Sequence, residues 1–154
     1  MSMDQAALSG QVVLITGAGT GIGAETALMF AQRGARVIAH YHQSAAGAQQ
    51  VVRKIEADGG RALALQADLT SEVQAAQLVQ RALARFDRLN VLVNNAGSVV
   101  ERTSLENCSL DLWRRAFDVN VTSAFLVTRA AIPALRAAPV MRATLCRSRG
   151  MRSP

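Results

Sequence analysis

The stretch that most constrains the fold runs from Val12 to Gly23 and reads VVLITGAGTGIG. Its aliphatic start predicts a strand buried on both faces, as in a parallel sheet. Beyond it, apolar residues recur at helical spacing up to Gly34, at Ala27, Leu28, Phe30 and Ala31. The glycines allow a tight strand-to-helix turn whose backbone N–H groups can approach an anion. We interpret the stretch as a phosphate cradle, with close helix-on-strand packing as the alternative.

The rest of the chain alternates predicted strands and helices joined by short links. We expect strands at 36–41, 62–67 and 90–94, helices at 44–58, 71–86 and 111–135, and a loop at 97–108. This alternation is typical of right-handed strand-helix-strand units. It predicts an α/β fold with a doubly wound parallel sheet of the Rossmann type.

Length and composition favour one domain without a membrane segment. The 154 residues are half hydrophobic, yet no apolar run approaches the ~18 residues that a membrane helix needs. The N-terminus lacks the basic and apolar regions of a signal peptide, so we expect a cytoplasmic protein. Cys108 and Cys146 show neither disulfide nor metal-ligand spacing, and we expect no metal site.

The positive charge is concentrated at the C-terminal end. The net charge is +6, and four of the arginines, with no acidic residue, lie in the last sixteen residues. We therefore predict a basic, atypical tail at 139–154, whose composition indicates a shifted reading frame or an unnatural end. Four arginines without interleaved aromatic residues do not predict nucleic-acid binding.

Two motifs together carry a resemblance to a known family. The first is TGxxxGIG, formed by Thr16, Gly17, Gly21, Ile22 and Gly23. The second is NNAG at 94–97, directly after an apolar run. Both resemble motifs of the short-chain dehydrogenase/reductase family, particularly its ketoacyl reductase and glucose dehydrogenase-like members. The resemblance implies strand order 3-2-1-4, with 1–138 as an NAD(P)-binding half-domain truncated after the fourth strand-helix unit.

The resemblance also implies a set of cofactor-binding residues: Thr16, Gly17, Thr20, Gly21, Ile22, Gly23, Tyr41, His42, Asp68, Leu69, Asn94, Ala96 and Gly97. Within this set, Asp68 is similar to the family's adenine contact, with the Leu69 N–H against the ring. Asn94 is similar to the residue that ties the central strands together. From the residues alone, Asp68 could instead cap the following helix, a role open also to Thr70 or Ser71.

The end of the second predicted strand bears on cofactor choice. An NAD site usually places an acid there, and no acid occurs between Glu25 and Glu56. By register with the family this position is Tyr41, and the HYHxS segment resembles that of some NADP-using relatives. Thr20, however, stands where many NADP-preferring members have a basic residue. We favour NADP over NAD, with two surface histidines at a strand end as the alternative.

The expected reaction is NAD(P)(H)-dependent oxidation or reduction of a hydroxyl or carbonyl group. Asn120 is similar to the family's helix asparagine, which holds a water of the proton relay; satisfying a backbone group is its alternative role. The family's acid is a tyrosine four residues before a lysine. Tyr41 is the only tyrosine and Lys54 the only lysine, so this pattern is absent from the chain.

We therefore expect the 154-residue chain to be catalytically inactive. The alternative function is a module that binds a dinucleotide, or associates with other chains, without catalysis. Self-association is expected through an exposed fourth strand and through Trp113 and Phe117 on the long helix.

Overall fold

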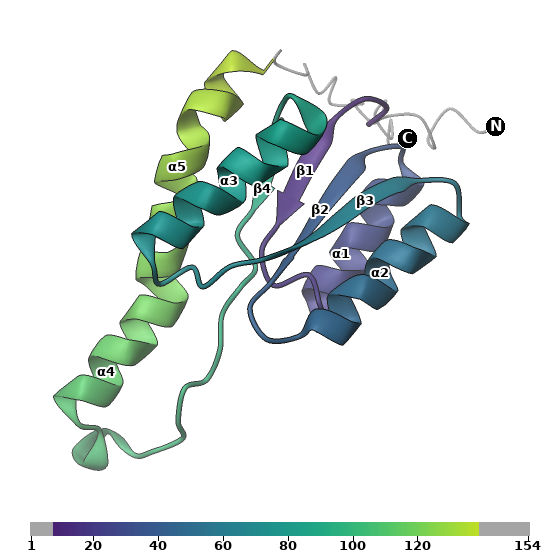
Figure 1. The fold of residues 1–154 in the computed structure, drawn as a ribbon. Helices are drawn as coiled ribbons and strands as arrows, with labels where there is room; N and C mark the ends of the chain where they lie inside the picture. The colour runs from purple at the N-terminus through teal and green to yellow at the C-terminus, as the bar shows by residue number, and fades with distance from the viewer. Residues whose placement is uncertain (1–7, 139–154) are drawn as a thin grey trace, which may run out of the picture.

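The computed structural model describes residues 8–138, which form a four-stranded parallel sheet covered by helices on both faces (Figure 1). The strands are β1 (Val12–Ile15), β2 (Arg36–Tyr41), β3 (Arg61–Gln66) and β4 (Val91–Val93). The helices are α1 (Gly21–Gln32), α2 (Ala45–Ala57), α3 (Glu72–Phe86), α4 (Leu110–Phe117) and α5 (Ser123–Ala137), with short helical segments η1 (Leu105–Asn107) and η2 (Asp118–Thr122).

The strand order is β3-β2-β1-β4, which confirms the predicted order. All three pairings are parallel, with Leu14 of β1 opposite Ile38 on one side and Leu92 on the other. The carboxyl ends of all four strands therefore meet at the same edge of the sheet.

The alternation of side chains along β1 divides the core in two. Val12 and Leu14 pack with buried residues of α3 and α5, whereas Val13 and Ile15 pack with buried residues of α1 and α2. All four β1 side chains are fully buried, which confirms a strand covered on both faces. Figure 1 shows the same two layers, with α1 and α2 on one face and α3 and α5 on the other.

The long helix predicted at 111–135 differs in detail. It runs from α4 into α5, but residues 118–122 form the wider π-helical turn η2. The amide of Asn120 donates 2.9 Å hydrogen bonds to the carbonyl oxygens of Ala116 and Ser98. The side chain thus satisfies a carbonyl near the wider turn and ties the helix to the segment after β4.

β4 is short and only partly buried, and within residues 8–138 it is an edge strand of the sheet. No helix in this described part of the chain is long and apolar enough to cross a bilayer. The predicted basic tail at 139–154 lies outside the described residues.

Candidate functional site

A cavity of about 740 Å³ lies at the carboxyl ends of the strands. Its walls come from five segments: the glycine turn after β1, the end of β2, the turn after β3, the segment after β4, and the long helix at Val119 and Ser123. A crevice at this edge of an open parallel sheet is where such folds bind ligands. Most of the predicted cofactor-binding residues line it, namely Gly17, Thr20, Gly21, Ile22, Gly23, Tyr41, His42, Asp68, Leu69, Ala96 and Gly97.

The glycine turn has the backbone that its sequence predicts. Gly17 and Gly21 have φ values of 67° and 53°, in the left-handed region that favours glycine. A Cβ at Gly23 would lie 2.3 Å from the Gly17 carbonyl oxygen, whereas a Cβ at Gly21 would meet nothing within 4 Å. Gly23 therefore serves close packing, and Gly21 leaves open space at the cavity wall.

Helix α1 directs its positive end at this cavity. The helix begins at Gly21, inside the glycine-rich motif. Thr20 precedes it without a side-chain capping hydrogen bond, and no acidic residue occupies the first turn. The helix dipole there is not neutralised by a neighbouring carboxylate, which favours an anionic ligand.

A second pair of glycines sets the position of the turn. A Cβ at Gly47, in the first turn of α2, would lie 2.0 Å from the Gly19 carbonyl oxygen. A Cβ at Gly19 would lie 2.9 Å from the Ser44 carbonyl oxygen. The start of α2 thus packs directly on the glycine turn, a contact that the single Gly47 could not reveal from sequence alone.

Thr16 lies below the cavity rather than in its wall. Its side chain is buried, and its hydroxyl oxygen accepts hydrogen bonds from the backbone N–H groups of Asn95, at 3.0 Å, and Ala96, at 2.9 Å. The same hydroxyl donates to the Val93 carbonyl oxygen at 3.3 Å. Thr16 therefore joins the end of β1 to the segment after β4.

The tie between the central strands belongs to Asn95, not to Asn94. The amide of Asn95 donates to the carbonyl oxygens of Thr16, at 2.9 Å, and Gly17, at 3.1 Å. The exposed Asn94 instead donates to the Thr128 hydroxyl on α5, at 2.9 Å. The Asn94 side chain therefore points to the face of the sheet that α5 covers.

Asp68 does not cap helix α3. One of its carboxylate oxygens accepts hydrogen bonds from the Thr70 N–H, at 2.9 Å, and from the Thr70 hydroxyl, at 2.7 Å. The hydroxyl and N–H of Thr70 lower the pKa of this carboxyl group, so it is ionised at neutral pH. Ser71 is the cap, accepting from the Gln74 N–H. Asp68 therefore remains available at the cavity wall.

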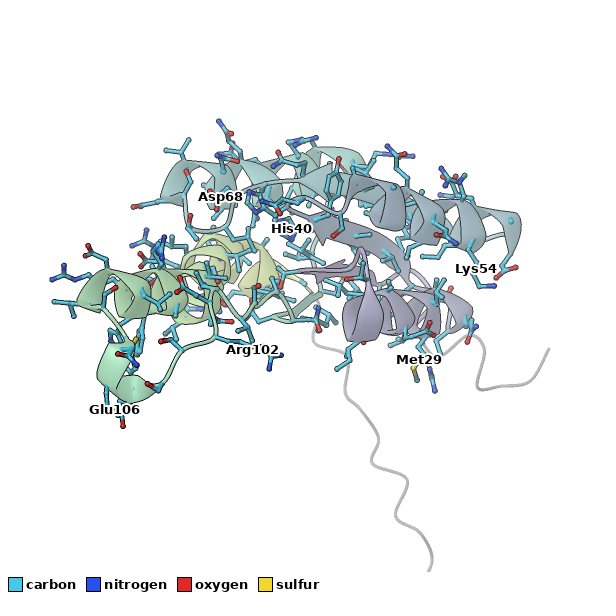
Figure 2. The ribbon with its side chains drawn as sticks, turned by 90° about the horizontal axis from the view of Figure 1, so that it is seen from below. Met29, His40, Lys54, Asp68, Arg102 and Glu106 are labelled. Atoms are coloured by element: carbon cyan, nitrogen blue, oxygen red, sulfur yellow. The ribbon has the colours of Figure 1, made fainter. Side chains whose placement is uncertain are left out.

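Few charged side chains line the cavity. Among the described residues, Asp68 is the only acidic side chain in the wall, and no lysine or arginine lines it. Figure 2 shows His40 and Asp68 in the middle of the molecule and Lys54 away from both. Tyr41 is half-buried and His42 exposed at the end of β2. Backbone N–H groups are thus the main source of positive potential for an anionic ligand.

His40 is not the surface histidine that the alternative interpretation assumed. Only 1% of it is exposed, and both ring nitrogens have backbone partners. The sequence signal was present, because β2 reads RVIAHY and position 40 falls inside the buried run. Asn120 lies outside the cavity wall, and its Oδ1 accepts from the Ser98 N–H at 2.9 Å.

Comparison with known proteins agrees with this geometry. The model of the short chain dehydrogenase family matches residues 11–141. The chain is 48% identical over 124 residues to an uncharacterized oxidoreductase of Methylorubrum extorquens, and 44% identical over 124 residues to a 3-oxoacyl-[acyl-carrier-protein] reductase of Synechocystis. Each match covers 80% of this chain and 50% of the relative, so the chain spans about half the length of these curated relatives.

Two solved structures are similar in fold. A short chain dehydrogenase from Burkholderia cenocepacia in complex with NADP has a TM-score of 0.79 and 40% identity, covering 84% of this chain and 52% of that one. The NADH-dependent reductase A1-R′ of alginate metabolism has a TM-score of 0.81 and 37% identity, covering 86% and 54%. The chain belongs to the short chain dehydrogenase family.

Proposed function

We propose that the chain binds a nicotinamide dinucleotide in the strand-end cavity, as the cofactor-binding part of an NAD(P)(H)-dependent oxidoreductase that acts on hydroxyl or carbonyl groups. The observation that carries the proposal is the glycine turn. It opens onto the cavity at the N-terminus of α1, where a Cβ at Gly21 would meet no protein atom within 4 Å.

The cavity residues fit the parts of a dinucleotide. In this proposal the pyrophosphate lies against the turn between Gly17 and Gly23, where backbone N–H groups and the helix dipole offset its charge. Asp68 accepts a hydrogen bond from the adenine amino group, and Leu69 lies beside the ring. The nicotinamide half extends toward Ala96 and Gly97, after β4.

The bound cofactor supplies or accepts the hydride, and the protein holds and orients it. Asn120 is proposed to position a water of the proton relay, as in the family it resembles. Its amide already holds the Ser98 backbone through two hydrogen bonds. An asparagine amide cannot donate a proton at neutral pH, and Tyr41 lies at the β2 end of the cavity. We therefore propose that the 154-residue chain alone binds cofactor without turning over substrate.

We favour NADP over NAD. A carboxylate at the end of β2 would bind the ribose hydroxyl groups of NAD and repel a 2′-phosphate. In its place stand Tyr41 and His42, with Ser44 nearby in the wall. The solved relatives include one in complex with NADP and one described as NADH-dependent, so the preference rests on the residues of this chain.

A second candidate function is association with another chain. Trp113, Phe117, Val121 and Phe125 recur at helical spacing from α4 to α5, and each is 45–57% exposed. The Trp113 and Phe117 rings lie 5.1 Å apart between centroids. Apolar surface of this extent on one helix face promotes association. A concentration-dependent increase in sedimentation coefficient that Phe117→Glu abolishes would support this function.

Dinucleotide titration of matched glycine variants tests the main proposal. Gly21→Glu places a bulky anion in the cradle, and Gly59→Glu is its control. Gly59 also has a positive φ, 82°, and open space around it, but it lies in the turn between α2 and β3. We expect Gly21→Glu to abolish NAD(P) binding while Gly59→Glu retains it. Equal affinity in both variants would refute the cradle.

A further inference from the structure

The buried imidazole of His40 connects two walls of the cavity. Its Nδ1 accepts a hydrogen bond from the Gly17 N–H, at 3.2 Å, and its Nε2 lies 3.0 Å from the Ala67 carbonyl oxygen. Gly17 begins the glycine turn, and Ala67 directly precedes Asp68. One ring therefore spans from the end of β1 to the end of β3, across its own strand β2.

These two contacts define the state of the ring. A nitrogen that accepts from an N–H group must carry a lone pair, so Nδ1 is unprotonated. The other nitrogen must then carry the hydrogen that it donates to Ala67. Only the neutral imidazole protonated at Nε2 makes both bonds. An imidazolium would present a second donor to the Gly17 N–H and lose that bond.

The backbone of the same residue strengthens the connection. The Ala18 N–H donates to the His40 carbonyl oxygen at 2.8 Å. Two consecutive amides of the glycine turn are thus fixed by residue 40, one through its side chain and one through its backbone.

We propose that His40 is a positioning residue, which holds the glycine turn in its binding conformation and links it to the strand end that carries Asp68, and does so only as the neutral ring. The inference rests on the proposed dinucleotide function for its effect on affinity. Its effect on the Gly17 amide can be measured without any ligand.

The surroundings of His40 favour the neutral ring. Burial lowers its pKa, the hydrogen bond to Ala67 opposes this, and the nearby His42 lowers it further. The other titratable groups of the cavity wall are Tyr41 on the same strand and Asp68 after β3, whose carboxylate is held by Thr70. At neutral pH the ring is therefore uncharged, and acidification below its pKa breaks the contact with Gly17.

The affinity for NAD⁺ as a function of pH, between about pH 5 and pH 8, tests the inference. NAD⁺ is the probe because the 2′-phosphate of NADP⁺ titrates near pH 6. We expect wild-type affinity to fall about tenfold in acid. His40→Asn keeps an acceptor near the Nδ1 position that does not titrate, and should bind with little pH dependence. His40→Leu should bind about tenfold more weakly at every pH.

His42→Gln tests whether the other histidine of the chain causes the pH dependence. We expect this variant still to lose NAD⁺ affinity in acid. Hydrogen exchange of the Gly17 amide without ligand provides the second readout. The protection of this amide, taken relative to its intrinsic exchange rate at each pH, should fall in acid in the wild type and at neutral pH in His40→Leu, but not in His40→Asn. If no variant binds NAD⁺ but this exchange pattern holds, the proposed function fails and the positioning role stands. A Gly17 protection factor that is independent of pH in the wild type would overturn the role, even if His40→Leu does not fold.

Discussion

Replacing Thr16 by valine removes the hydroxyl that joins β1 to the segment after β4 with little change in shape. That hydroxyl accepts from two backbone N–H groups, of Asn95 and Ala96, and donates to the Val93 carbonyl oxygen. Valine cannot accept, so both N–H groups lose a partner. A buried unsatisfied donor costs about 1–3 kcal/mol, and we expect Thr16→Val to destabilise the fold by about 2–4 kcal/mol.

Thr16→Ser is the matched control. Serine keeps the hydroxyl and loses one buried methyl group, which costs about 1 kcal/mol. Urea unfolding followed by far-UV circular dichroism measures both variants. Because small domains are stable by only about 5–15 kcal/mol, the expected difference is large enough to resolve. A Thr16→Val variant as stable as Thr16→Ser would refute the role assigned to the hydroxyl.

The remaining predictions concern the cavity wall. Gly23→Ala should abolish NAD(P) binding and lower stability in urea, because its Cβ would lie 2.3 Å from the Gly17 carbonyl oxygen; unchanged affinity would contradict the packing argument. Tyr41→Asp should shift preference toward NAD by about 1–3 kcal/mol in parallel titrations of the two cofactors, since a carboxylate repels the 2′-phosphate. The contribution of His40 to the free energy of unfolding should be fully present above pH 6.5 and decline below it. The reason is that the unfolded chain protonates His40 while the fold keeps it neutral. Urea midpoints of wild type and His40→Asn should therefore converge in acid, and parallel curves would exclude His40 as the group responsible.

Much of the fold followed from local patterns. The aliphatic run of β1 and the alternation of strands and helices were sufficient for the class, and the family resemblance supplied the strand order that the structure confirms. The π-helical turn at residues 118–122 and the contact between Asn120 and Ser98 could not be predicted, because the contact joins segments distant in the sequence. Periodicity reports one element at a time and cannot detect such a contact.

The candidate site was likewise only partly predictable from the sequence. Sequence motifs placed Gly17, Gly21 and Gly23 at the cavity, but assigned to Asn94 a tie that Asn95 makes. A motif gives the residues without their directions, and the direction is set by where the strand ends. The role of His40 cannot be predicted from the sequence, because it depends on Gly17 and Ala67, which are its neighbours only after the strands pair.

In the proposed site, the glycine turn and the ends of β2 and β3 bind one dinucleotide. Titration of the ¹⁵N-labelled chain with NADP⁺ and NAD⁺, followed by amide chemical shifts, tests it most directly. Saturable shifts are expected at residues 17, 19–23, 41–44 and 68–70, which line the cavity. Absence of shifts there, or shifts confined to the smaller hollow beside Leu105 and Trp113, would contradict it.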